Sequence, residues 1–176
     1  MSLERKGLLE FRGREVTIIG EDIRIGMKAP EFRAQTMDWT SIKVLESTEG
    51  KVRIIGSLPS LNTAVCDRET RRFNLEAAAL GEEIAILMVS RDLPFTLSQW
   101  CGAAGIDQVI TLSDQKDMEF GEKYGVLIKE LAVFRRAVFV VNPKGIVEYV
   151  EYLPAIGEEP DYEAVIEAAR KAKTLD

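Results

Sequence analysis

The chain has 176 residues, 46% of them hydrophobic and 30% charged, which is the composition of one globular domain with a substantial core. Its formal net charge is −6, and its Lys and Arg residues are dispersed among acidic ones, which argues against a nucleic-acid partner. Histidine is absent, so catalytic triads, Cys-His proteases and zinc hydrolases that depend on it are excluded.

Short β-branched runs alternate with helix-like segments along the chain. The predicted strands cover 15–20, 51–58, 83–90, 108–114, 137–143 and 146–152. In most of them the apolar residues are continuous rather than alternating, as expected of strands covered on both faces. The predicted helices cover 66–81, 95–105, 118–125 and 161–173. The turn sequence NPKG joins the last two strands into an antiparallel hairpin, so we expect an α/β domain with a central mixed β-sheet flanked by helices.

The N-terminal segment differs in composition from the rest of the chain. Residues 1–14 are polar and lack a clear pattern, so we expect a loosely ordered N-terminal extension before a single domain of residues 15–176. The start of the chain lacks the apolar segment of a secretory signal, and no apolar run approaches the roughly 20 residues that a membrane-spanning helix needs. These features predict a cytoplasmic protein with no membrane partner.

Cys66 stands at the start of the helix predicted after the strand at 51–58. The first turn of a helix presents unpaired N–H groups and the positive end of the dipole, an environment that favours a reactive thiolate. Most unpaired cysteines are small buried hydrophobic residues, and position alone favours that interpretation. Thr63 places a hydroxyl near the thiol or caps the helix, and Pro59 fixes the loop between strand and helix.

The second cysteine, Cys101, lies on another predicted helix, beyond one intervening strand. Because no CxxC occurs, neither a zinc ribbon nor a thioredoxin-type dithiol can form. A distant cysteine pair in a cytoplasmic chain is seldom a permanent disulfide. A pair that forms a transient, catalytic disulfide is therefore the more specific hypothesis.

The pattern P-x-x-x-T-x-x-C, formed by Pro59, Thr63 and Cys66, resembles the active-site signature of the peroxiredoxins. A longer set of motifs over about residues 15–170 is similar to the atypical two-cysteine thiol peroxidases of bacteria: IGMKAPEF, PSLNTAVC, RRFNLEAA, RDLPFTLSQWCGAAGI, VITLSD, RAVFVV and EPDYEAVI. VTIIGEDIRIG, residues 16–26, resembles the N-terminal β-hairpin of that subfamily. Asn62 departs from the aspartate usual in the subfamily, and both residue types form turns readily.

The resemblance implies a thioredoxin-like fold of the peroxiredoxin type and a thiol-dependent peroxidase of antioxidant defence. Cys66 would be the peroxidatic cysteine, Cys101 the resolving cysteine of the same subunit, and Arg136, rather than its neighbour Arg135, the arginine that pairs with the thiolate and the peroxide. Pro59 and Thr63 complete the implied catalytic set. Hydrogen peroxide and organic hydroperoxides are the implied substrates, thioredoxin the reductant, and a homodimer the assembly; neither a cofactor nor a metal is expected.

Two thiols on separate helices are unsuited to a disulfide, which needs Cα atoms about 5.5 Å apart. We therefore expect one or both helix ends to unwind on oxidation, helped by Gly102 and Gly105 beside Cys101. Trp100 should report that change by fluorescence, and we expect both tryptophans, Trp39 and Trp100, to be packed in the core.

Two other interpretations stay open from the residues alone. The first is a thiol–disulfide oxidoreductase or redox sensor on the same fold, whose Cys66 would react with peroxide no faster than a free thiol. The second is a non-enzymatic module, chaperone-like or purely structural, with two inert, buried cysteines, which rapid alkylation of Cys66 at neutral pH would exclude.

Overall fold

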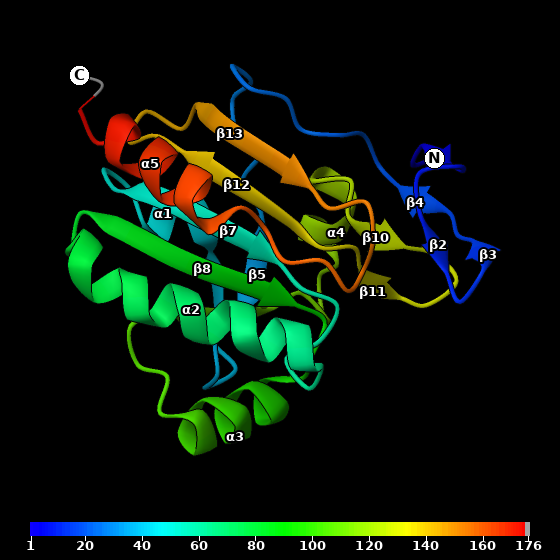
Figure 1. Cartoon of the computed structure of the whole chain (residues 1–176), viewed down its shortest axis with the longest axis horizontal. Helices are drawn as coiled ribbons and strands as arrows, with labels where there is room; N and C mark the ends of the chain where they lie inside the picture. Colours follow the sequence, from blue (N-terminus) through cyan, green and yellow to red (C-terminus); the bar gives the residue numbers. More distant parts are fainter. Residues whose placement is uncertain (175–176) are drawn as a thin grey trace.

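A computed structural model describes residues 1–174 (Figure 1). Three sheets are formed: a seven-stranded sheet in the order β13-β12-β7-β8-β9-β5-β6, a four-stranded sheet in the order β1-β4-β10-β11, and the hairpin β2-β3. The helices are α1 (Val44–Ser47), α2 (Ala64–Leu80), α3 (Pro94–Ala104), α4 (Glu119–Lys123) and α5 (Tyr162–Ala172). The strands are β1 (Glu4–Arg5), β2 (Glu10–Phe11), β3 (Arg14–Glu15), β4 (Ile18–Ile19), β5 (Arg33–Gln35), β6 (Ser41–Lys43), β7 (Val52–Ser57), β8 (Ile84–Ser90), β9 (Ile110–Ser113), β10 (Leu127–Ile128), β11 (Val133–Phe134), β12 (Ala137–Val141) and β13 (Val147–Tyr152).

The centre of the large sheet combines parallel and antiparallel pairs. β7, β8 and β9 run parallel to one another, while β12 runs antiparallel to both β7 and β13. The predicted hairpin and the predicted mixed sheet are therefore confirmed. All four expected helices are present near their expected positions.

Both faces of this sheet are covered, which explains why its central strands β7, β8 and β12 are buried at every position and do not alternate between apolar and polar residues. In β12, Val138 and Val140 pack on one face with apolar residues of α2 and α5, whereas Phe139 and Val141 pack on the other with Phe120 of α4. Figure 1 shows α2 and α5 in front of the sheet and α3 beside α2. Within residues 1–174, no helix is both long enough and apolar enough to traverse a bilayer.

The N-terminal segment is more ordered than we expected. β1 pairs with β4, and Leu9 is buried in a small apolar cluster with Val16, Ile18 and Ile128. The expected hairpin at residues 16–26 is displaced: the hairpin is β2-β3, and β4 instead pairs with β1 and β10. The expected end of the domain, residues 175–176, lies outside the described residues.

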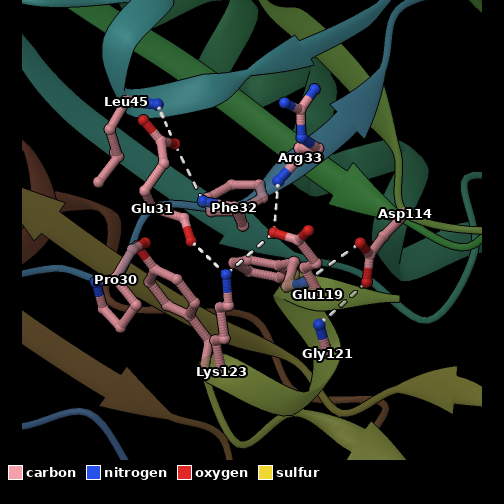
Figure 2. Close-up of polar contacts among 11 residues, drawn as sticks. Pro30, Glu31, Phe32, Arg33, Leu45, Asp114, Glu119, Gly121 and Lys123 are labelled. Carbon is pink, nitrogen blue, oxygen red and sulfur yellow. Dashed lines mark hydrogen bonds and ion pairs between the residues drawn. The ribbon is translucent and has the colours of Figure 1, made fainter. Parts of the chain in front are cut away.

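Two carboxylates cap the two short helices on the α4 side of the sheet (Figure 2). Glu31 accepts hydrogen bonds from the backbone N–H groups of Leu45 and Glu46 at the start of α1, 2.8 Å in each case. Asp114 accepts hydrogen bonds from the N–H groups of Phe120 (3.2 Å) and Gly121 (3.0 Å) in α4. These bonds satisfy helix N–H groups that have no partner within the helix.

Candidate active site

The first turn of α2 follows the carboxyl end of the parallel strand β7, the edge at which open α/β sheets usually bind ligands. Thr63 has extended backbone angles (φ −91°, ψ 146°), and its hydroxyl accepts a hydrogen bond from the backbone N–H of Cys66 at 3.3 Å. Thr63 is thus the N-cap residue of α2. Cys66 lies in the first turn, as predicted, and its side chain is fully buried.

Strand register brings Arg136 to the same place. Ala137 of β12 pairs with Ser57 of β7, so Arg136, immediately before β12, lies beside the loop that leads into α2. Its Nη2 donates a hydrogen bond to Cys66 Sγ at 3.2 Å. Nη2 and Nε also donate to the carbonyl oxygen of Ile156, at 3.1 and 3.3 Å. The guanidinium is thereby fixed against the sulfur.

Arg135 points to the other face, because successive residues of an extended chain alternate in direction. It pairs with Asp22, donates a hydrogen bond to the carbonyl of Gly125 at 2.9 Å, and stacks on Tyr152 with its guanidinium carbon 4.0 Å from the ring centroid. Of the two adjacent arginines, only Arg136 reaches the thiol in this structure.

Glu69 is a further member of the cluster around Cys66 and Arg136, and the sequence did not predict it. Glu69 lies one turn after Cys66 on α2 and forms an ion pair with Arg136 in which neither side chain is exposed. Within residues 1–174, its Oε1 atom has no hydrogen-bond partner. The sequence offers one signal for it, the spacing of positions 66, 69 and 73 on one helix face, but this spacing does not show that the carboxylate is buried.

Burial dominates the electrostatics of this pair. It raises the pKa of Glu69 to about 7, although the positive charge of Arg136 and its hydrogen bond oppose the shift. Burial disfavours the charge of Arg136 too, but the neighbouring Glu69 and Cys66 more than compensate, so the pKa of Arg136 is raised. Arg136 therefore stays protonated, and Glu69 can change its charge near neutral pH.

The loop before α2 is held by Asp92. Its carboxylate accepts hydrogen bonds from the Ser60 hydroxyl (2.7 Å), the Leu61 N–H (2.9 Å) and the Ser90 hydroxyl (2.8 Å). Pro59 is buried at the start of this loop. Asp92 immediately precedes the residues that lead into α3, so one carboxylate ties the Cys66 loop to the beginning of the helix that carries Cys101.

Cys101 lies in the last part of α3 and faces the sheet. Its sulfur is 3.4 Å from the hydroxyl of Thr111 on β9. Burial raises the pKa of the Cys101 thiol, and the hydrogen bond with Thr111 opposes this only in part. Cys66 and Cys101 are both free thiols.

A depression of about 540 Å³ lies over the start of α2. Its lining includes Thr63, Asp67 and Trp100. Trp100 is partly buried and packs against the α2 side of the core, as expected. Trp39 does not: it is 41% exposed and stacks edge-on with Phe95, so the expectation of a core residue is wrong there.

The comparisons with known proteins agree with this architecture. A model of the AhpC/TSA family matches residues 25–150. The chain belongs to the AhpC/TSA family. It is 48% identical over 162 residues to the thiol peroxidase of Bacillus subtilis, covering 92% of this chain and 96% of the relative. The thiol peroxidase of Halalkalibacterium halodurans is 46% identical over 164 residues, with 93% and 98% covered.

A solved structure supports the fold directly. The crystal structure of a peroxiredoxin-like protein from Aquifex aeolicus superimposes with a TM-score of 0.85 at 33% identity, covering 95% of this chain and 98% of the other. The predicted thioredoxin-like fold of the peroxiredoxin type is therefore confirmed. At the level of enzyme class, this chain is a thiol-dependent peroxidase, as the sequence predicted.

Membership of the peroxiredoxin family implies a hydroperoxide as the substrate and a thiol as the reductant. Within residues 1–174, no group of three or more His, Cys, Asp or Glu side chains is placed to hold a metal ion.

Proposed function

We propose that Cys66 reduces hydroperoxides and that Cys101 resolves the product as a disulfide within the same chain. The observation that carries this proposal is the 3.2 Å hydrogen bond from Arg136 to the Cys66 sulfur in a fully buried setting. A cation held there is placed to stabilise negative charge that develops on a peroxide oxygen.

In the first step, the Cys66 thiolate attacks the terminal oxygen of the hydroperoxide. The O–O bond breaks, sulfur is oxidised to sulfenic acid, and the other oxygen takes a proton and leaves as water or an alcohol. Arg136 and the Thr63 hydroxyl are the groups that would hold the peroxide oxygens in line. Pro59 shapes the loop from which both Thr63 and Cys66 follow.

In the second step, the Cys101 sulfur attacks the sulfenic sulfur, which forms the disulfide and releases water. The Cys66 sulfur is bonded by Arg136, immediately before β12, whereas the Cys101 sulfur lies beside Thr111 of β9. β12 and β9 are three positions apart in the sheet, so at the usual strand spacing the axes of these two strands are roughly 14 Å apart. We therefore propose that α3 unwinds around Cys101 before the bridge closes.

A dithiol reductant must then return both cysteines to thiols. We propose thioredoxin in this role and the cytoplasm, where thiols are kept reduced, as the compartment. We further propose hydrogen peroxide and organic hydroperoxides as substrates, with no cofactor besides the cysteine pair. A coupled assay with thioredoxin, thioredoxin reductase and NADPH tests the reductant, and NADPH consumption that persists without thioredoxin would reject it.

We also propose a homodimer. An exposed apolar surface formed by Trp39 (41% exposed), Leu93 (47%) and Phe95 (69%) supports it, because apolar patches on a soluble chain commonly mark contacts. This surface lies next to Asp92, which holds the Cys66 loop. Light scattering after size exclusion should show a dimer that Phe95→Asp converts to a monomer, and a wild-type monomer would reject the proposal.

Intact mass spectrometry tests the central chemistry. Fully reduced protein is treated with one equivalent of cumene hydroperoxide, in parallel with Cys101→Ser. We expect the wild type to lose two hydrogens and the variant to gain one oxygen. Unchanged masses in both would refute peroxidase chemistry at Cys66 and would favour thiol–disulfide exchange.

A further inference from the structure

Three side chains on one face of α2 hold the far end of α3 and the loop that follows it. Asp67 Oδ1 accepts a hydrogen bond from Trp100 Nε1 at 3.2 Å, and Arg71 Nη1 donates one to the carbonyl of Ala104 at 3.2 Å. One turn further on, Asn74 Oδ1 accepts a hydrogen bond from the backbone N–H of Gln108 at 2.9 Å. The spacing of 67, 71 and 74 places all three on the same side of α2.

Arg71 connects these contacts to one another. Its Nε donates to Asp67 Oδ2 at 2.9 Å, and its guanidinium carbon lies 5.8 Å from the ring centroid of Trp100. The Ala104 carbonyl belongs to the last turn of α3, where carbonyls lack partners within the helix. Arg71 thus caps the end of α3 and holds Trp100 at the same time.

Cys101 lies between the two points at which α3 is held, immediately after Trp100 and three residues before Ala104. Any movement that frees the Cys101 sulfur by unwinding residues 101–105 separates Ala104 from Arg71 and shifts Trp100 away from Asp67. The contacts are half-exposed, with 48% of the Arg71 side chain and 32% of the Asp67 side chain accessible. Exposed ion pairs are individually weak, so the contacts can be broken and reformed in each cycle.

We propose that Asp67, Arg71 and Trp100 form a latch that controls how often α3 opens and therefore how fast Cys101 resolves the Cys66 sulfenic acid. These are positioning residues, since they act through α3 rather than on the peroxide. The inference rests on the proposed function, because it needs Cys101 to be the resolving cysteine. It goes further by naming the contacts that set the rate at which Cys101 attacks the Cys66 sulfenic acid.

The latch has a chemical consequence, because the sulfenic acid has two fates. Attack by Cys101 gives the disulfide and water, whereas attack on a second hydroperoxide gives sulfinic acid and water or an alcohol, a dead end for most cysteines. A tighter latch slows the first route and leaves the second unchanged. The latch therefore sets the peroxide concentration at which the enzyme inactivates itself.

Arg71→Ala is the direct test, and Arg72→Ala is its matched control. Arg72 is the next residue of α2 and also forms a 2.9 Å ion pair four residues along the helix, with Glu76, but its guanidinium stacks on Tyr162 of α5. Both variants lose the same side chain from the same helix. Only Arg71→Ala removes contacts with α3.

Two measurements compare the variants. In reduced protein, hydrogen exchange of the α3 amides reports opening without any peroxide. The second measurement follows single turnovers with excess cumene hydroperoxide, quenched at set times and analysed by intact mass. The rate of disulfide formation and the yield of sulfinic acid then show how the sulfenic acid divides between its two fates. We expect Arg71→Ala to accelerate both α3 exchange and disulfide formation about two- to fivefold, the upper part of the range expected for a surface pair, and to lower the sulfinic yield.

The control and a conservative variant sharpen the result. Arg72→Ala should match the wild type in all three readouts. Arg71→Lys keeps a charge for Asp67 but cannot reach Asp67 and Ala104 in a forked geometry, so it should fall between the wild type and Arg71→Ala. It also serves as the test if the alanine variant folds poorly.

Equal α3 exchange and equal partition in Arg71→Ala and Arg72→Ala, with disulfide formation intact, would overturn the latch alone. Absence of any Cys66–Cys101 disulfide in the wild type would instead overturn the proposed function, and the role of the latch in resolution with it.

Discussion

The buried pair of Glu69 and Arg136 yields a prediction about stability and pH. Because burial raises the pKa of Glu69 from 4.5 to about 7, the folded protein binds this proton more tightly than the unfolded chain does. As the pH rises from 4.5 to 7, the unfolded chain gives up the proton first, so unfolding becomes easier. Stability from this group is therefore lost across that window and is constant above it.

The magnitude follows from the same values. A change of one in pKa corresponds to about 1.4 kcal/mol, so the rise from 4.5 to about 7 corresponds to about 3 kcal/mol. Glu69→Gln is neutral at every pH and mimics the protonated acid. At pH 4.5 the two proteins should unfold with similar free energies, and at pH 8 the glutamine variant should be the more stable by about 3 kcal/mol.

Urea unfolding at pH 4.5, 6 and 8, followed by far-ultraviolet circular dichroism, measures the difference. Both proteins should carry Cys66→Ser, so that neither the thiol charge nor its oxidation enters the comparison. Other groups with raised pKa values, such as Asp114, contribute equally to both proteins and cancel. Parallel pH curves would refute the raised pKa, and a wild type that gains on the variant as the pH rises would show that pairing with Arg136 outweighs desolvation.

Three further predictions concern the site and its supports. Arg136→Lys keeps the charge but cannot bond Glu69, Cys66 and the Ile156 carbonyl together, so stopped-flow kinetics should show peroxide reduction slowed about 100-fold; a rate within threefold of wild type would contradict the role of the guanidinium. Thr63→Val removes the N-cap acceptor and should lower the free energy of unfolding by about 1 kcal/mol, whereas Thr63→Ser should restore it; equal losses in both variants would contradict the cap. Asp114→Ala removes two hydrogen bonds to the start of α4 (Figure 2) and should lower the free energy of unfolding by about 1 to 2 kcal/mol in urea titrations at pH 8; an unchanged midpoint would contradict that capping role.

Much of the fold follows from patterns long enough to read in the sequence. The central strands β7, β8 and β12 are rich in apolar residues without alternation and are buried throughout, and α2 repeats buried positions at helical spacing from Cys66 to Leu80. The strands β10 and β11 have two residues each. A period of two cannot be recognised over two residues, and these strands are recognisable only from their pairing with each other and of β10 with β4.

The residues of the site also differ in how far the sequence predicts them. Cys66 at the head of a helix was predictable from local sequence, and Arg136 followed from the resemblance of its motif. Glu69 was overlooked because a glutamate within a charged helix is ordinarily a surface residue. Its burial depends on α2 lying across β7 and β8, where Met88 occupies the space above Gly56: a Cβ added to Gly56 would lie 2.5 Å from the Met88 methyl and 3.8 Å from Glu69 Oε1. This packing of α2 on the sheet is a property of the tertiary structure, so the sequence pattern does not show that Glu69 is buried.

The choice between Arg135 and Arg136 shows how sheet register decides chemistry here. A shift of β12 by one residue along β7 would turn every side chain to the opposite face and present Arg135 to Cys66. The register is held from both sides: the Ser57 hydroxyl donates to the Arg135 carbonyl at 2.9 Å, and the Arg135 side chain is anchored by Asp22 and Gly125. The arginine that never contacts the sulfur therefore fixes the position of the one that does, because its anchoring excludes the shifted pairing.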